Sequence, residues 1–223
     1  MDRHNSQVDI SEIQFTGSNS FNNLVTINAP GTTKIRGIET DLTVKPADGL
    51  TLTAAYTYTY TRISQVLITA NARNAAGVIT ATSQVLQDFF IVFTPRNAAS
   101  GAIDYELPIG GADTALRFHL DAAYSQATQT FDQFATKNDA SFFLNGRISL
   151  TQIKLGSGDQ TLNVSLWGRN LLDGQFVFRR DPSNSLPGSP TTSVVTGNVG
   201  NTLGDYGNFN APRTFGIEGT VRF

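Results

Sequence analysis

The sequence predicts an all-β, antiparallel fold, and three observations support this prediction. The 223 residues are rich in Thr, Gly and Phe, with 20 glycines, 15 phenylalanines and only 15% charged residues, which is typical of a β protein. Apolar and polar residues alternate over long stretches, which is the period of a β-strand. Short and long breaks also alternate along the chain, as in an up-and-down sheet whose short turns all lie on one side.

The alternation defines eight expected strands, several of them 12 or more residues long. In one strand Leu and Tyr alternate with Thr, and in the last strand apolar residues alternate with polar ones to the end of the chain. Such lengths exceed the roughly 5–6 residues of a soluble strand and reach the roughly 9–11 needed to cross a bilayer at a tilt. The expected strands are 7–15, 24–44 (interrupted at Pro30-Gly31), 49–62, 90–106, 114–126, 140–154, 160–171 and 212–223.

The breaks between these strands fall into two classes. The short ones contain Pro, Gly and Asp, which supply the backbone angles of tight turns. For residues 66–87, inside a long break, two readings stay open: a hairpin that extends beyond the sheet or a mobile loop. No linker interrupts the chain, so residues 1–223 are expected to form one unit. The short turns are 45–49, 107–113 and 155–159, and the long loops are 16–23, 63–90, 126–139 and 172–211.

The composition excludes several classes of protein and site. The absence of cysteine excludes a disulfide scaffold, a thiolate metal site and a cysteine nucleophile. A net charge of −2 argues against a nucleic-acid binder, and four Glu and four Lys are too few for a coiled coil. No apolar run is long enough for a transmembrane helix, and the first residues do not predict a signal peptide.

Two architectures share the observed alternation. In a soluble β-sandwich the apolar face is the core, whereas in a membrane barrel it contacts lipid and the polar face lines the lumen. Strand length favours the barrel, as do Tyr56, Tyr58 and Tyr60, which gather at one strand end like an aromatic girdle. Charges inside the strands favour it too. The residues expected to face the lumen, as candidates for plug or substrate contact, are Glu39, Asp41, Arg117, His119, Asp121, Arg147 and Glu218.

Three motifs, in order, resemble those of TonB-dependent outer-membrane receptors. Residues 28–42 (NAPGTTKIRGIETDL) resemble the strand NAG-x-A-x-x-x-G-x-E-x-x-L of that family, with Pro30 in place of the usual Ala-Gly run. Residues 164–173 (VSLWGRNLLD) resemble the segment V-x-N-L-F-D, with Leu172 in place of the aromatic residue. Residues 211–217 (APRTFGI) resemble the ending PR-x-(Y/F)-x-x-x-(V/L). The resemblance covers about residues 7–223.

The resemblance implies a segment of a 22-stranded transmembrane barrel, with short turns in the periplasm and long loops outside the cell. This chain would be its C-terminal eight strands, and the plug domain, the TonB box and the signal peptide would lie outside residues 1–223. TonB would then act only through the missing plug. An apolar terminal strand ending in Phe also resembles the signal read by the barrel-assembly machinery, and its candidate residues are Phe215, Ile217, Val221 and Phe223.

The function implied by the resemblance is TonB-energised uptake of a scarce small-molecule ligand across the bacterial outer membrane. A ferric siderophore is the first expectation, and vitamin B12 and carbohydrates are other ligands of the family. Arg179 and Arg180, at the base of the longest loop, are candidates for contact with an anionic ligand, since Arg pairs suit carboxylates and phosphates. The plainer reading of these arginines, and of the Arg117, His119 and Asp121 patch, is solvated charge.

No catalytic, metal or cofactor constellation is recognised, so we expect no enzyme and no cofactor. His119 and the near-terminal His4 do not make a metal site, and no Ser-His-Asp set is implied. Lipid, the assembly machinery and a small-molecule ligand are the expected partners, without nucleic acid. Two other readings stay open: a standalone eight-stranded barrel with a structural or adhesive role, and a soluble β-sandwich binding module that folds without detergent.

Overall fold

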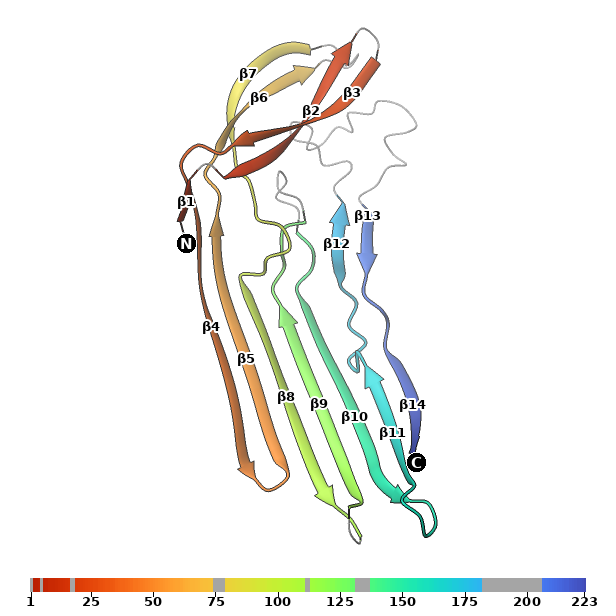
Figure 1. The fold of residues 1–223 in the computed structure, drawn as a ribbon. Coiled ribbons are helices and arrows are strands. Elements are labelled where there is room, and N and C mark those ends of the chain that lie inside the picture. Colours follow the sequence, from red (N-terminus) through yellow and green to blue (C-terminus); the bar gives the residue numbers. More distant parts are fainter. Residues whose placement is uncertain are drawn as a thin grey trace.

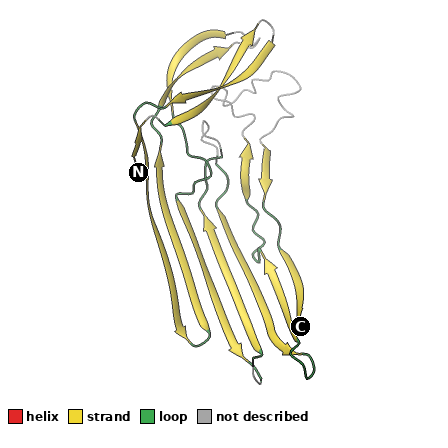
Figure 2. Ribbon diagram, viewed as in Figure 1, coloured by secondary structure: helices red, strands yellow, loops and turns green. Residues whose placement is uncertain are grey.

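The structure, a computed structural model, describes residues 2–4, 6–16, 19–73, 79–110, 113–130, 137–181 and 206–223. In this part of the chain all regular structure is β-strand (Figure 2). Eight strands form one antiparallel sheet in the order β1-β4-β5-β8-β9-β10-β11-β14, which confirms the all-β prediction. They are β1 (Asp2–His4), β4 (Thr32–Ala47), β5 (Leu50–Arg62), β8 (Asn97–Pro108), β9 (Ala115–Ser125), β10 (Ser141–Lys154), β11 (Thr161–Arg169) and β14 (Thr214–Arg222).

The main sheet is a single curved layer with two ends of different character (Figure 1). At one end, short turns join β4 to β5, β8 to β9 and β10 to β11. At the other end, three hairpins extend beyond the sheet, each pairing only with itself. They are β2–β3 (Gln7–Thr16 and Asn19–Asn28), β6–β7 (Val66–Arg73 and Ile79–Gln87) and β12–β13 (Val177–Asp181 and Tyr206–Phe209).

The apolar face of the main sheet is exposed. On β9 the apolar residues alternate with Arg, His and Asp, and pairing aligns them with apolar residues of the neighbouring strands. One such row runs through Tyr105, Phe118, Ile148, Leu166 and Ile217, of which Ile217 is 76% exposed. Tyr105 and Phe118 stack with ring centroids 6.4 Å apart. A soluble sandwich would bury an apolar face of this extent, whereas the strands of a membrane barrel present such a face outward.

Two of the expected strands are placed differently by the structure. Residues 7–15 were expected in the main sheet, but as part of β2 they pair with β3 in a separate hairpin. Residues 24–44 form two strands, β3 and β4, because the chain breaks at Pro30, which has no N–H to donate, and at Gly31, whose φ is +92°. The expected number of eight strands in the sheet is confirmed, but β1 takes the place predicted for 7–15.

The long loops also contain more regular structure than predicted. Of the two readings for 66–87, the hairpin is confirmed by β6 and β7. The strand expected at 90–106 begins only at Asn97, since the preceding residues form a loop in which Phe93 has a φ of +50°. Within 172–211, β12 and β13 pair, while 182–205 lie outside the described residues, as do 131–136 of the loop 126–139.

Buried apolar residues gather at the roots of two hairpins rather than between two layers. Val8, Ala29, Val66 and Phe89 form this cluster, with exposed fractions of 6% or less. Val8 lies in β2 and Val66 in β6, whereas Ala29 and Phe89 follow the last residues of β3 and β7. The partly buried residues that pack against them are Ile27, Ile63 and Ile68. Burial of these side chains therefore joins the hairpins β2–β3 and β6–β7 where they leave the sheet.

Glycine is required at the turn between β4 and β5. Gly49 has a φ of +75°, and its carbonyl accepts a hydrogen bond from the Glu106 N–H at 2.8 Å. A Cβ at this position would collide with the Glu106 carbonyl oxygen. Gly110, in the next short turn, has a φ of +83° but open space around it, since a Cβ there would meet no atom within 4 Å.

We expect Gly49→Ala to lower the free energy of unfolding more than Gly110→Ala. Both changes place an L-residue in the left-handed region, at a cost of about 1–2 kcal/mol. Only Gly49→Ala also forces the β8 backbone away from the turn. Urea unfolding in lipid vesicles measures both variants against the wild type. Equal losses for the two variants would contradict the close approach of β8 to Gly49.

Candidate functional site

The polar face of the main sheet carries all seven residues predicted to face the lumen. Strand pairing fixes this placement: His119 lies opposite Arg147, and Asp121 lies opposite Asn145. Glu218 lies opposite Ser165, and Asp41 opposite Ala55. Because side chains alternate along a strand, each of these residues points away from the apolar face. The seven are Glu39, Asp41, Arg117, His119, Asp121, Arg147 and Glu218.

Two arginines of this face are paired with carboxylates from other strands. Arg117 Nε lies 2.9 Å from Glu106 Oε2, which joins β9 to β8. Arg147 donates from a terminal guanidinium nitrogen to Glu218 Oε2 at 2.7 Å, which joins β10 to β14 across β11. All four side chains are roughly half-exposed, so each pair stabilises the sheet weakly.

His119 lies between two carboxylates. Its Nδ1 is 2.6 Å from Asp104 Oδ1, and its Nε2 is 3.3 Å from Asp121 Oδ1. The other oxygen of Asp121 accepts a hydrogen bond from the Asn145 side-chain amide at 2.8 Å. The polar chain Asp104–His119–Asp121–Asn145 therefore runs across β8, β9 and β10. An anionic ligand at this point would have to displace carboxylates that already occupy both ring nitrogens.

The main ion pair can be tested by a double-mutant cycle. For Arg147→Ala and Glu218→Ala we expect a coupling of about 0.2–1 kcal/mol in the free energy of unfolding, as for other partly exposed pairs. A matched cycle of Arg147→Ala with Asp41→Ala serves as the control, since Asp41 lies on β4, beyond three intervening strands. Equal coupling free energies in the two cycles would show that the coupling comes from long-range electrostatics and not from the 2.7 Å contact between Arg147 and Glu218.

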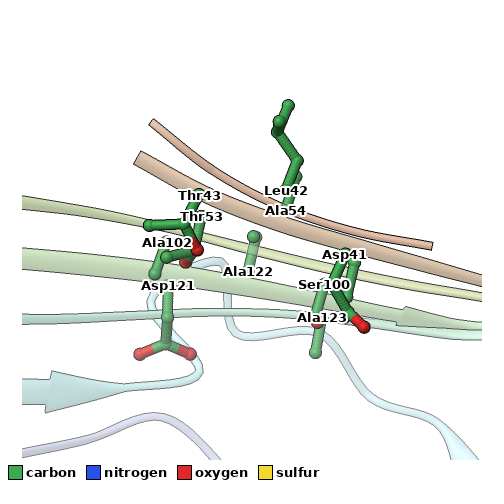
Figure 3. A pocket seen from close by; sticks show the side chains of 12 residues that line it. Asp41, Leu42, Thr43, Thr53, Ala54, Ser100, Ala102, Asp121, Ala122 and Ala123 are labelled. Carbon is green, nitrogen blue, oxygen red and sulfur yellow. The ribbon is translucent and has the colours of Figure 1, made fainter. Parts of the chain in front are cut away.

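Small side chains form an open recess over β5, β8 and β9. Its volume of about 300 Å³ is lined by residues of both faces of the sheet, and on the polar side it lies between Asp41 and Asp121. Figure 3 shows the Asp121 carboxylate and the Leu42 side chain pointing away from the sheet in opposite directions. Between the two carboxylates the polar face is nearly flat, so it leaves room for atoms of another segment. The small residues on this side are Thr53, Ala55, Ser100, Ala102 and Ala123.

The two predicted outer-loop arginines lie next to each other in β12 and therefore on opposite faces of it. The Arg180 guanidinium lies 3.3 Å from Asp139 Oδ1, and its carbonyl accepts a hydrogen bond from the Thr130 hydroxyl at 2.7 Å. Asp139 also accepts from the Val177 N–H at 2.9 Å. Arg180 thus connects β12 with the loop before β10. The side chain of Arg179, in contrast, is exposed.

The segment after β11 is tightly bonded around Asn170. Asn170 is 4% exposed, has a φ of +51°, and bonds through its side chain with the Gly174 N–H and carbonyl, both at 3.0 Å. It also donates to the Ala211 carbonyl at 3.2 Å. Asp173, with a φ of +54°, accepts from the Arg213 N–H at 3.1 Å. This loop, which contains the NLLD sequence, therefore ties β11 to the segment that enters β14.

Sequence reasoning missed three polar residues of the site. Asp104 and Glu106 supply the carboxylates for His119 and Arg117, and Asn145 holds Asp121. The signal for the first two was the alternation of Asp and Glu with Ile, Tyr and Leu over residues 103–107. No metal site accompanies them, since the described residues hold no group of three or more His, Asp or Glu suited to a metal ion.

The terminal strand presents its apolar residues on the exposed face. Phe215, Ile217 and Val221 lie on one side of β14, and Phe223 follows its last residue. The Arg213 guanidinium carbon lies 5.8 Å from the centroid of the Phe215 ring. On its other edge β14 has no partner strand among the described residues. Recognition of these residues by the assembly machinery stays a prediction.

A long-stranded antiparallel sheet with an exposed apolar face, an ion-paired polar face and short turns at one end defines a segment of a transmembrane β-barrel. A family model described as TonB dependent receptor-like, beta-barrel matches residues 5–171. The chain therefore belongs to the TonB-dependent receptor β-barrel family, which comprises receptors and transporters of the bacterial outer membrane rather than enzymes.

Two other comparisons add no relative. No curated protein and no solved structure matches the chain. Within the described part of the chain, no helix has the length and hydropathy needed to span a membrane.

Proposed function

We propose that the chain is the C-terminal part of the wall of an outer-membrane receptor that takes up a ferric siderophore with energy delivered through TonB. The observation that carries this proposal is that the single-layered main sheet has one apolar face and one charged face. One face exposes apolar residues to lipid, and the other carries charged side chains that suit a water-filled or plugged lumen. Family membership supports the receptor role.

The edges of the sheet support a larger barrel. Six successive antiparallel pairings separate β4 from β14, so these two strands run in the same direction. They cannot close the sheet as an antiparallel pair, and β1 pairs with only three residues of β4. Backbone groups without partners are costly in lipid. Because β1 and β14, the two edges of the sheet, are seven pairings apart and run antiparallel, we place an even number of further strands, outside residues 1–223, between them, which disfavours a standalone barrel.

The polar face would contact the plug, which also lies outside residues 1–223. The recess between Asp41 and Asp121 has room for atoms of such a segment, and the Asp104–His119–Asp121 chain borders it. TonB would act on the plug and not on this chain. Arg179 is the better placed of the two outer-loop arginines to contact an anionic ligand, because Arg180 is held by Asp139.

Uptake of radioactive iron tests the proposal in the bacterium that carries the gene. We expect deletion of the gene to abolish uptake of 55Fe bound to a hydroxamate or a catecholate chelator, and a proton-gradient uncoupler to have the same effect. The complete reading frame that contains residues 1–223 should restore uptake, whereas residues 1–223 alone should not. Unchanged uptake after deletion would overturn the siderophore role, and rescue by residues 1–223 alone would overturn the proposed missing plug.

A further inference from the structure

Four cationic side chains lie at the hairpin end of the outward, apolar face. Lys34 of β4 lies directly opposite Arg62 of β5, and Arg36 lies opposite Tyr60. These positions share the face of Ile38, which is 65% exposed. The Arg96 guanidinium carbon lies 5.3 Å from the centroid of the Tyr60 ring. We call Lys34, Arg36, Arg62 and Arg96 the basic belt. Its residues lie near the start of β4, at the end of β5 and just before β8, and the ends of β4 and β5 are uppermost in Figure 1.

The belt has little negative charge facing it. Asp2 lies 3.6 Å from Arg36, and it stands opposite Lys34 in the pairing of β1 with β4. No other outward position of β4, β5 or β8 carries a carboxylate. Cations directly opposite each other across two strands, such as Lys34 and Arg62, repel and destabilise a sheet. An anion bound between them would remove this cost.

Arg96 of the belt is held on the outward face by two tyrosine rings. Arg96 lies over the rings of both Tyr60 and Tyr58, the latter at 5.9 Å, which fixes its guanidinium beside the tyrosines. Below them, the Tyr56 hydroxyl donates to the Asn97 side-chain oxygen at 2.6 Å. Tyrosines with their polar ends satisfied mark the membrane–water interface of a barrel.

The depth of the belt fits the headgroup region. Eleven residues separate Arg36 from Ala47, where β4 ends at the short-turn side. At about 3.3 Å per residue the distance along the strand is about 36 Å, or about 28 Å along the bilayer normal for a tilt of about 40°. The apolar band of such barrels is about 25 Å tall. Arg36 and the belt therefore lie just beyond the hydrocarbon, level with the lipid headgroups.

We propose that the basic belt binds the phosphate groups of a lipid headgroup in the outer leaflet. Several arginines within one cluster suit a headgroup with more than one phosphate, because each guanidinium can donate two parallel hydrogen bonds to phosphate oxygens. The acyl chains of that lipid would lie on the exposed apolar face below, along Ile38 and Leu42. This inference rests on the proposed function, which places the hairpin end outside the cell.

Binding of lipid A with two phosphates to the purified full-length protein in detergent micelles tests the proposal. We expect Arg36→Gln/Arg62→Gln/Arg96→Gln to weaken binding about a hundredfold, since each cation near an anionic lipid surface contributes similarly. A matched variant with Lys45, Lys154 and Arg222 changed to Gln at the short-turn end should bind as the wild type does. Dephosphorylated lipid A should bind the wild type as weakly as the triple variant binds lipid A.

Three results would overturn the proposal: equal affinity of the triple variant and the wild type, equal affinity for the dephosphorylated lipid, or equal affinity for inorganic phosphate. If the triple variant does not fold, the single change Arg62→Gln decides, with an expected loss of about fivefold. Lipid binding without iron uptake would refute the siderophore role alone. Iron uptake with no effect of the belt substitutions on lipid binding would refute the belt alone.

Discussion

Leu120→Arg should lower the free energy of unfolding in a lipid bilayer by about 2–4 kcal/mol. Leu120 is the middle residue of β9, 40% exposed on the apolar face, and it lies between Ile103 and Gly146 in the pairing. A guanidinium there would lie at the centre of the hydrocarbon, where its transfer from water is most costly. Unfolding by guanidinium chloride in vesicles, followed by Trp167 fluorescence, measures the loss.

Two control variants separate lipid exposure from general disruption. Leu107→Arg, on the same face near the short-turn end, should cost only about 0–1 kcal/mol because it lies near the interface. Ala123→Arg, on the polar face beside the recess, should be tolerated. If the apolar face were in contact with water, Leu120→Arg would change the free energy of unfolding by less than about 0.5 kcal/mol. That outcome would refute a lipid-facing β9.

Asn170→Ala should lower the free energy of unfolding by about 3 kcal/mol. The change removes three side-chain hydrogen bonds to Gly174 and Ala211. The half-buried Gly174 N–H loses its side-chain acceptor, whereas both carbonyls still accept from the Asn210 side-chain amide. It also places Ala at a φ of +51°, a conformation that Asn tolerates better than Ala. Denaturant unfolding in vesicles measures the loss, and protease cleavage between β11 and β14 should become faster.

Asn170→Gly separates the two causes. Glycine accepts the left-handed backbone angle but makes no side-chain hydrogen bond, so Asn170→Gly should lose about 1–2 kcal/mol less than Asn170→Ala. Leu172→Ala, two residues on and 60% exposed, should be nearly neutral. A loss at Leu172→Ala as large as that at Asn170→Ala would show that the whole loop, and not the Asn170 hydrogen bonds, ties β11 to β14.

Much of the fold could be predicted because a period of two fixes which residues share a face. That the seven polar-face residues share one face follows from that period, and strand pairing shows the shared face, while their contact with plug or substrate stays a prediction. The period does not say which strands pair. Residues 7–15 were expected to form a strand of the main sheet, yet they pair with β3 in a separate hairpin. The partners of His119 and Arg117 were missed because they depend on the register of β8.

The loop contacts could not be predicted from the sequence. Asn170 is one of several Asn residues in polar surroundings, and its left-handed angle depends on Gly174 and Ala211, which approach it only in the folded chain. The pair of Arg179 and Arg180 looked like one anion site in the sequence. In a strand their side chains diverge, and Arg180 contacts Asp139, forty-one residues away.

The buried cluster of Val8, Ala29, Val66 and Phe89 has a consequence for the dynamics of the hairpins β2–β3 and β6–β7. Because it packs the roots of β2–β3 and β6–β7 together, we expect the two hairpins to move as one body. A molecule that holds one hairpin in place restricts the other through this joint. When a ligand binds both hairpins, conformational entropy is then lost only once. The contacts with the second hairpin therefore cost less conformational entropy than those with the first.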